Sequence, residues 1–168
     1  NTRLSYALAR EGVSVDLLAG TAVGGASVGT DTILGGVFEV RGSNFDDTLF
    51  GSHGSDFLFG GNGDDVLFGR AGNDFMDGGS GSDRIVFDAN LTAADVIIGG
   101  SGTDTVVLSA PATYAAGLVL GKTSFSGVEV LELGDGNNYR LTLNDGNADG
   151  ALTVDAARAL TIHGAPVG

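Results

Sequence analysis

A nine-residue repeat in the middle of the chain constrains the fold more than any other feature of this sequence. Five units follow one another without a gap, and they begin at Gly42, Gly51, Gly60, Gly69 and Gly78. In every unit the first residue is Gly, the sixth is Asp and the eighth is a large apolar residue. A fixed short period of this kind indicates a stack of similar structural units.

The pattern extends beyond the five contiguous units on both sides. After a three-residue insertion at 87–89, two further units place Asp95 and Asp104 at the sixth position. Upstream, residues 26–34 match the pattern more loosely, with Asp31 at the sixth position. We therefore expect most of the first two thirds of the chain to share one repetitive architecture.

The repeat G-G-x-G-x-D-x-U-x, where U is large and apolar, resembles the RTX (hemolysin-type) calcium-binding nonapeptide repeat of secreted bacterial proteins. The strong resemblance covers roughly residues 26–107, about half of the chain. It implies an all-β fold: a right-handed parallel β-roll, or β-solenoid, of stacked repeats with a C-terminal β-rich continuation or cap. It also implies export by type I secretion.

Elementary stereochemistry leads to the same arrangement. The Gly-rich first six residues form a turn, because glycine permits positive φ and close backbone approach. The last three residues form a short strand with the eighth side chain inward. Two units make one coil of 18 residues, so the sixth-position aspartates align in two columns. One column contains Asp47, Asp65, Asp83 and Asp104, and the other contains Asp56, Asp74 and Asp95.

Stacked carboxylates require a cation. Adjacent coils lie about 4.8 Å apart, a distance at which carboxylates repel strongly. Calcium accepts six to eight oxygen ligands, whereas magnesium needs a stricter octahedron and zinc prefers His or Cys. The alternative is that these aspartates only shape Asx turns.

The resemblance implies calcium ions between turns that are 18 residues apart, each bound by two sixth-position carboxylates and by carbonyls of positions one to four. The strongest sites are expected between the units at 42 and 60, 60 and 78, and 51 and 69, although Phe45 replaces the usual Gly in the first. The predicted ligands are the aspartates Asp47, Asp56, Asp65, Asp74, Asp83, Asp95 and Asp104 and the turn residues Gly42, Asn44, Gly51, His53, Gly60, Gly61, Asn62, Gly63, Gly69, Ala71, Gly72, Gly79 and Gly81.

The chain divides into three predicted segments. Residues 1–41 form a β lead-in or cap with a degenerate repeat, and residues 42–107 form the calcium-binding roll. Residues 108–168 continue or cap the roll, and a small separate β-sandwich is the alternative for them. Alternating triplets predict four strands in this last segment: Leu131–Leu133, Leu141–Leu143, Leu152–Val154 and Leu160–Ile162.

One stretch of the C-terminal segment matches half of an EF-hand loop. Asp145, Asn147, Asp149 and Gly150 have the spacing D-x-[DN]-x-[DN]-G, but Ala156 stands where an EF-hand needs Glu. This stretch is therefore no EF-hand; it is either an isolated calcium loop or an ordinary turn.

Composition excludes several classes of protein. The 168 residues carry a net charge of −13 with a single lysine, Lys122, so binding to nucleic acid is unfavourable. No apolar run approaches the roughly 18 residues of a membrane span, and there is no cysteine for a disulfide or thiol site. Because Asn1 begins the sequence and no signal peptide follows, we interpret the chain as a piece of a longer protein.

Nothing in the sequence predicts catalysis. The two histidines, His53 and His163, are 110 residues apart, and His53 falls in a repeat turn where side chains point to solvent. Adjacent acids such as Asp64 and Asp65 are a poor match for the separated carboxylates of a glycosidase.

Aromatic side chains flank the inward position of several units. They are Phe50, Phe57, Phe59, Phe68 and Phe75, and the 18-residue spacing predicts outward ladders. Such a patch favours self-association or contact with an adjoining domain. The alternative is that these rings cover the edges of the roll itself.

Together these features predict a module that binds several calcium ions and folds on binding them outside the cell. It would be a structural or adhesive part of a larger secreted or surface protein of a Gram-negative bacterium, such as an adhesin or a surface-layer component. The alternative is the non-catalytic RTX region of a type I-secreted protease, lipase or polysaccharide-modifying enzyme. The sequence of the parent protein would distinguish the two.

Overall fold

The computed structural model describes residues 2–88, 90–109, 118–120, 125–134, 139–143, 153–156 and 160–164, and every regular element in these ranges is a β-strand. The strands are β1 Thr2–Ser5, β2 Ser14–Asp16, β3 Thr21–Val23, β4 Thr30–Thr32, β5 Val37–Arg41, β6 Thr48–Phe50, β7 Phe57–Asn62, β8 Val66–Phe68, β9 Phe75–Ser80, β10 Arg84–Phe87, β11 Val96–Ser101, β12 Thr105–Leu108, β13 Leu118–Leu120, β14 Phe125–Ser126, β15 Val130–Leu133, β16 Tyr139–Leu143, β17 Thr153–Ala156 and β18 Leu160–Gly164.

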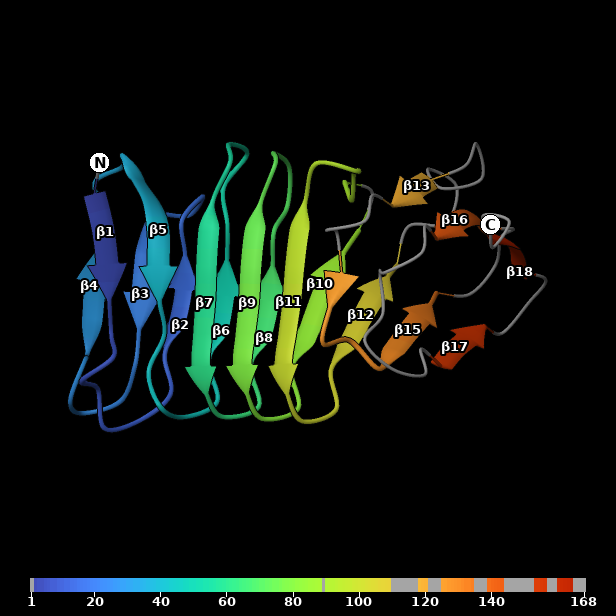
Figure 1. Cartoon of the computed structure of the whole chain (residues 1–168). Helices are drawn as coiled ribbons and strands as arrows, with labels where there is room; N and C mark the ends of the chain where they lie inside the picture. Colours follow the sequence, from blue (N-terminus) through green and yellow to red (C-terminus); the bar gives the residue numbers. More distant parts are fainter. Residues whose placement is uncertain are drawn as a thin grey trace.

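Successive strands of the repeat region alternate between two sheets. One sheet has the order β1-β5-β7-β9-β11-β14, and the other has the order β17-β15-β12-β10-β8-β6-β2-β3-β4. All pairs within the first sheet are parallel, as are those from β2 through β6 to β17 in the second. Figure 1 shows the resulting stack, with the N-terminus at one end of the row of strands. The predicted all-β parallel solenoid is confirmed.

The nine-residue period places one apolar side chain of each unit in the core. In one sheet Leu49 pairs with Leu67 and Leu67 pairs with Ile85; in the other, Leu58 pairs with Met76. All five side chains are fully buried. The core is therefore a narrow double row of aliphatic side chains between the two sheets.

Two local features differ from the prediction. The eighth position is not the only inward one, because the sixth-position aspartates are also buried, at 0–2% exposure. In addition, β7, β9 and β11 each have six residues instead of three and continue into the next turn. In these extensions Gly61 pairs with Gly79, because the 18-residue coil superimposes equivalent turn residues.

The N-terminal segment closes one end of the second sheet. The pairs β2–β3 and β3–β4 are antiparallel, so residues 26–34 do not form a coil of the stack. Asp31 lies exposed in β4, where it accepts a hydrogen bond from the Tyr6 hydroxyl at 3.0 Å. A turn closed by the bond from Gly20 N to Asp16 O reverses the chain after β2, and this reversal prevents a parallel coil.

Strand pairing continues beyond the repeats. β15 pairs with β12, β17 pairs with β15, and β13, β16 and β18 form a third parallel sheet. Each of the four predicted triplets overlaps one of these strands. The half EF-hand at 145–150 lies outside the described residues, and the division of the chain into three segments stays a prediction. Within the described part of the chain, no helix is long and apolar enough to cross a membrane.

Candidate metal-binding columns

The first column, Asp47, Asp65, Asp83 and Asp104, runs along the edge where β7, β9 and β11 end, which is the lower edge in Figure 1. A ladder of hydrogen bonds joins its members through Oδ1. The backbone N–H of Asp47 donates to Asp65 Oδ1 at 2.7 Å, that of Asp65 donates to Asp83 Oδ1 at 2.9 Å, and that of Asp83 donates to Asp104 Oδ1 at 2.8 Å. Each carboxylate is thereby fixed to the neighbouring coil.

The other carboxylate oxygen has no such partner in most of this column. Oδ2 of Asp65, Asp83 and Asp104 is buried and accepts no hydrogen bond. Burial, reinforced by the carboxylates of Asp47 and Asp83, raises the pKa of Asp65 to about 8. Burial likewise raises the pKa of Asp83 to about 6, with Asp104 adding to the rise. A buried, unpaired carboxylate oxygen is costly unless a proton or a cation meets it.

The turn glycines are required for two different reasons. Gly61 and Gly63, at positions two and four, have positive φ of 124° and 113°, as predicted. Gly60, at position one, does not; instead, a Cβ there would strike Asp65 Oδ2 and the carbonyl oxygen of Gly78. The first position is therefore glycine because the carboxylate and the next coil lie against its Cα, which is the close approach expected of glycine and not a positive φ.

The second column, Asp56, Asp74 and Asp95, runs along the opposite edge and contains the same ladder. Asp56 N donates to Asp74 Oδ1 at 3.0 Å, and Asp74 N donates to Asp95 Oδ1 at 2.7 Å. Burial raises the pKa of Asp74 to about 7. Both columns therefore lie in the same kind of buried environment.

The second column differs in what meets Oδ2. Asp56 Oδ2 accepts bonds from Ser52 N at 2.6 Å and from Ser52 Oγ at 2.9 Å. Asp95 Oδ2 accepts bonds from Thr92 N at 2.6 Å and from Thr92 Oγ1 at 3.1 Å. Among the described residues, no carboxylate oxygen of this column is buried without a partner.

Arg70 lies on the same edge as the second column. It occupies the second position of its unit, where the first-column units at 60, 78 and 99 have glycine, and its φ is 67°. Its Nη1 donates to the carbonyl oxygen of Gly51 at 2.7 Å and to Asp16 Oδ1 at 2.7 Å, and its Nη2 donates to Asp16 Oδ2 at 2.8 Å. The guanidinium also lies over the Phe50 ring, 5.2 Å from its centroid. Arg70 thus links the second column to β2.

A comparison with protein families decides the identity of the repeats. The family model for the RTX calcium-binding nonapeptide repeat matches residues 39–67, 54–85 and 92–110, in four copies. The chain carries RTX repeats. These repeats imply that it binds Ca²⁺, and no catalytic family is evident beside them. Among curated proteins, none matches the chain.

The remaining predicted ligands in the RTX turns fall into two groups according to their burial. The first-position glycines Gly42, Gly51, Gly60 and Gly69 are buried beside the carboxylates, whereas the others are half-buried or exposed: Asn44, His53, Gly61, Asn62, Gly63, Ala71, Gly72, Gly79 and Gly81. The side chain of His53 is exposed, as a turn residue at position three should be. Asn62 Nδ2 donates to Asn44 Oδ1 at 2.7 Å, which links two turns along the outside.

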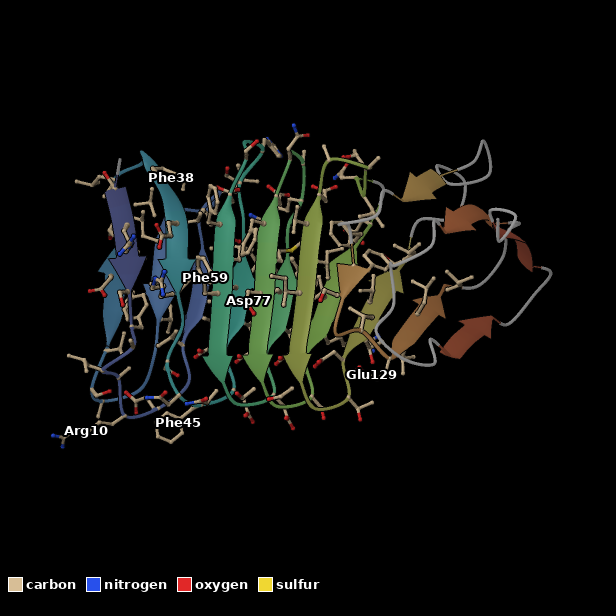
Figure 2. All side chains as sticks on the ribbon, in the orientation of Figure 1. Arg10, Phe38, Phe45, Phe59, Asp77 and Glu129 are labelled. Atoms are coloured by element: carbon tan, nitrogen blue, oxygen red, sulfur yellow. The ribbon has the colours of Figure 1, made fainter. Side chains whose placement is uncertain are left out.

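Glu129, which belongs to none of the predicted ligands, lies at the end of the first column beyond the RTX repeats (Figure 2). Its Oε2 accepts the backbone N–H of Asp104 at 2.8 Å, the same role that each aspartate plays for its neighbour. The sequence contains a signal for this role. Glu129 precedes the buried Leu131 by two residues, and every sixth-position Asp precedes the large apolar residue of its unit by the same distance.

The donors of the first column fit calcium. In the described ranges, no group of three or more His, Cys, Asp or Glu side chains converges as a metal site. A cation would therefore take two carboxylates and complete its shell with backbone carbonyls, an all-oxygen set that suits Ca²⁺ and not Zn²⁺. The unpaired Oδ2 atoms of Asp65, Asp83 and Asp104 are the observation that supports this fit.

The predicted aromatic ladders are present and mostly half-buried. Phe50 stacks on Phe68, with centroids 4.5 Å apart, and Phe57 stacks on Phe75 at 5.8 Å. Arg41 covers the ring of Phe59 at 4.4 Å. Of the five rings, Phe57 is the most exposed, at 42%.

Proposed function

We propose that this chain is a calcium-dependent structural module that folds after export, as part of a larger secreted or surface protein of a Gram-negative bacterium. The repeats are of a family typical of secreted bacterial proteins. The observation that supports the proposal most strongly is the row of buried, unpaired carboxylate oxygens at Asp65, Asp83 and Asp104.

The proposed switch depends on charge. Each fully ionised column places carboxylates on successive coils, and their repulsion opposes folding in a chain whose net charge is −13. When calcium is bound, it supplies the compensating positive charge, and binding to the folded state stabilises that state by mass action. Asp65 and Asp83 hold their side chains ready for this, because Oδ1 of each is already fixed by the ladder.

The proposed ligands of the first column are neighbouring pairs of carboxylates. Asp47 with Asp65, Asp65 with Asp83, and Asp83 with Asp104 would each hold an ion together with turn carbonyls. The first of these pairs has the weakest support, because Asp47 Oδ2 already accepts the backbone N–H of Ser43 at 2.5 Å.

Circular dichroism during a calcium titration tests the switch. Strand signal should be low in EGTA and should rise between about 10⁻⁴ and 10⁻³ M calcium, the range of extracellular calcium modules. Magnesium at equal concentration is the control and should not restore the signal. A full strand signal in EGTA would refute calcium-dependent folding.

Self-association through Phe50, Phe57, Phe59, Phe68 and Phe75 stays a prediction. The double variant Phe57→Ser, Phe75→Ser tests it by sedimentation in calcium. A wild-type chain that is monomeric at all concentrations would remove the idea, as would a variant that associates like the wild type.

A further inference from the structure

We infer that calcium loads only the first column, and that Arg70 serves as the resident cation of the second. This inference rests on the proposed function and adds to it which of the two edges responds to calcium. It departs from the expectation of a calcium site between the units at 51 and 69. Four observations support it, each concerning residues of the second column or their equivalents in the first.

The first observation is that the second column has its own hydrogen-bond donors. Ser52 gives both its N–H and its hydroxyl to Asp56 Oδ2, and Thr92 gives the same two groups to Asp95 Oδ2. In the first column, Ser43 gives its N–H to Asp47 Oδ2 in the same way, but the equivalent oxygens of Asp65 and Asp83 have no donor. A cation is therefore needed at Asp65 and Asp83, and it would stabilise Asp56 and Asp95 less.

The second observation is that Arg70 uses a carbonyl that a metal ion would need. By position, the carbonyl of Gly51 is one of those expected to bind calcium between the units at 51 and 69. It instead accepts the hydrogen bond from Arg70 Nη1. A divalent ion there would have to displace the guanidinium from both Gly51 and Asp16.

The third observation is electrostatic. Arg70 Nη1 is hydrogen-bonded to the carbonyl oxygen of Gly51, in the turn whose sixth-position carboxylate is Asp56. Arg70 therefore lies close enough to stabilise the charge of Asp56 and to repel a second cation. Because the side chain of Arg70 is 26% exposed, water screens this interaction only in part.

The fourth observation concerns the last turn of the second column. Residues 90–95 contain no glycine, and Leu91 at position two points into the core with 4% exposure. The equivalent first-column turn has Gly100 and Gly102 at positive φ, 116° and 136°. Without these backbone conformations, the turn before Asp95 cannot present its carbonyls as the first-column turns do.

Counting bound ions in two matched variants tests the inference. Asp83→Asn and Asp74→Asn make the same change at equivalent places, and each keeps a side-chain oxygen for the ladder. Native mass spectrometry at saturating calcium should show at least one ion fewer in Asp83→Asn and the wild-type number in Asp74→Asn. A loss of ions in Asp74→Asn equal to that in Asp83→Asn would overturn the inference. If the wild-type chain bound no calcium, the proposed function itself would fail.

Arg70→Gly tests the role of the arginine, since it introduces the residue that the first-column units at 60, 78 and 99 have at this position. We expect it to bind one ion more than the wild type. Arg41→Gly removes the same charge from β5, and Asp16→Asn breaks the same ion pair while keeping the cation; both should bind the wild-type number. An unchanged count in Arg70→Gly, or an equal gain in Arg41→Gly, would refute the assignment to Arg70. Should Arg70→Gly not fold, the comparison of Asp83→Asn with Asp74→Asn still decides which column binds calcium.

Discussion

The two aspartate columns place the same residue at the same position of the repeat on opposite edges of one roll. Both are buried, both are joined by the ladder from backbone N–H to Oδ1, and burial raises the pKa of a central member in each, Asp65 to about 8 and Asp74 to about 7. Burial therefore imposes a similar electrostatic cost on the two edges. The columns differ in the groups that face the second oxygen and in the glycines of their turns.

That difference comes from positions two and three of the turn. Where position two is glycine, Oδ2 is left unpaired, as at Asp65 and Asp83. Where these positions hold Ser52, Arg70 or Thr92, a hydroxyl or a guanidinium takes over part of the compensation. The buried carboxylate of the sixth-position Asp needs a cation or hydrogen-bond donors. The residues at positions two and three determine which of these compensates its charge.

The largest expected effect concerns the turns themselves. Gly63 in the first column has φ of 113°, and a Cβ there would lie 2.5 Å from the backbone carbon of Phe45. We expect Gly63→Ala to reduce the free energy of unfolding in calcium by about 3 kcal/mol, from strain and overlap together.

Gly54→Ala is the matched control, at the same position of a second-column turn. The nearest atom to its Cβ would be Ser52 Oγ at 3.6 Å, so the change should stay within about 0.5 kcal/mol. Urea denaturation of both variants measures the difference. Equal losses would contradict the idea that the positive φ of Gly63 and the backbone that lies against it decide the cost.

The second prediction uses pH to separate the columns. The folded-state pKa values of Asp83, Asp74 and Asp65 are raised to about 6, 7 and 8, above the ordinary value of 3.8. The folded state therefore binds protons more tightly than the unfolded state does. Its stability is fully present below about pH 4 and is lost as pH rises through these values.

In EGTA, strand signal should accordingly be greater at pH 5 than at pH 8, because protons replace the missing cations. In saturating calcium, most of this dependence should disappear, and the remainder should belong to Asp74 in the second column. Asp74→Asn should then remove the remainder. An equal pH dependence with and without calcium would show that the ion does not meet these carboxylates.

The nine-residue period was sufficient to predict the solenoid, the core positions and the alignment of both columns. The period could not predict that the two columns differ. Ser52 and Arg70 are single changes at a variable position of the repeat, and their donors reach their acceptors only in the folded coil. Residues 26–34 have a similar apolar alternation but form an antiparallel hairpin, since a reversal at Asp16–Gly20 sets strand direction. Period-two alternation is the same for parallel and antiparallel strands.

The third prediction concerns the link between the second column and the N-terminal hairpin. Asp16→Ala should reduce the free energy of unfolding by about 1 kcal/mol, because it removes two charge-assisted bonds to a partly buried Arg70. The side-chain hydrogen bond from Arg70 lowers the pKa of Asp16, so this contribution is present above about pH 4 and is lost as pH falls. The pH dependence of this contribution is therefore opposite in sign to that of the carboxylate columns.

The exposed ion pair of Arg84 and Glu132 supplies the control for Asp16→Ala. These two side chains are 45% and 41% exposed, and Glu132→Ala should change stability by less than about 0.5 kcal/mol. Thermal unfolding in calcium compares the two variants. A cost at Glu132 equal to that at Asp16 would mean that Arg70 has no special role as a link.

The fourth prediction concerns the end of the first column. Asp104 N donates to Glu129 Oε2 at 2.8 Å, so the ladder continues one coil past the repeats. In the second column, by contrast, Asp95 N bonds to Thr92 O at 3.4 Å within its own turn.

Glu129→Gln keeps an acceptor oxygen and should leave stability within about 0.5 kcal/mol. Glu129→Ala leaves the N–H of Asp104 unpaired and should cost about 1 kcal/mol, measured by urea denaturation. Equal stabilities for the two variants would mean that the hydrogen bond, and with it the extension of the first column, contributes nothing to the fold.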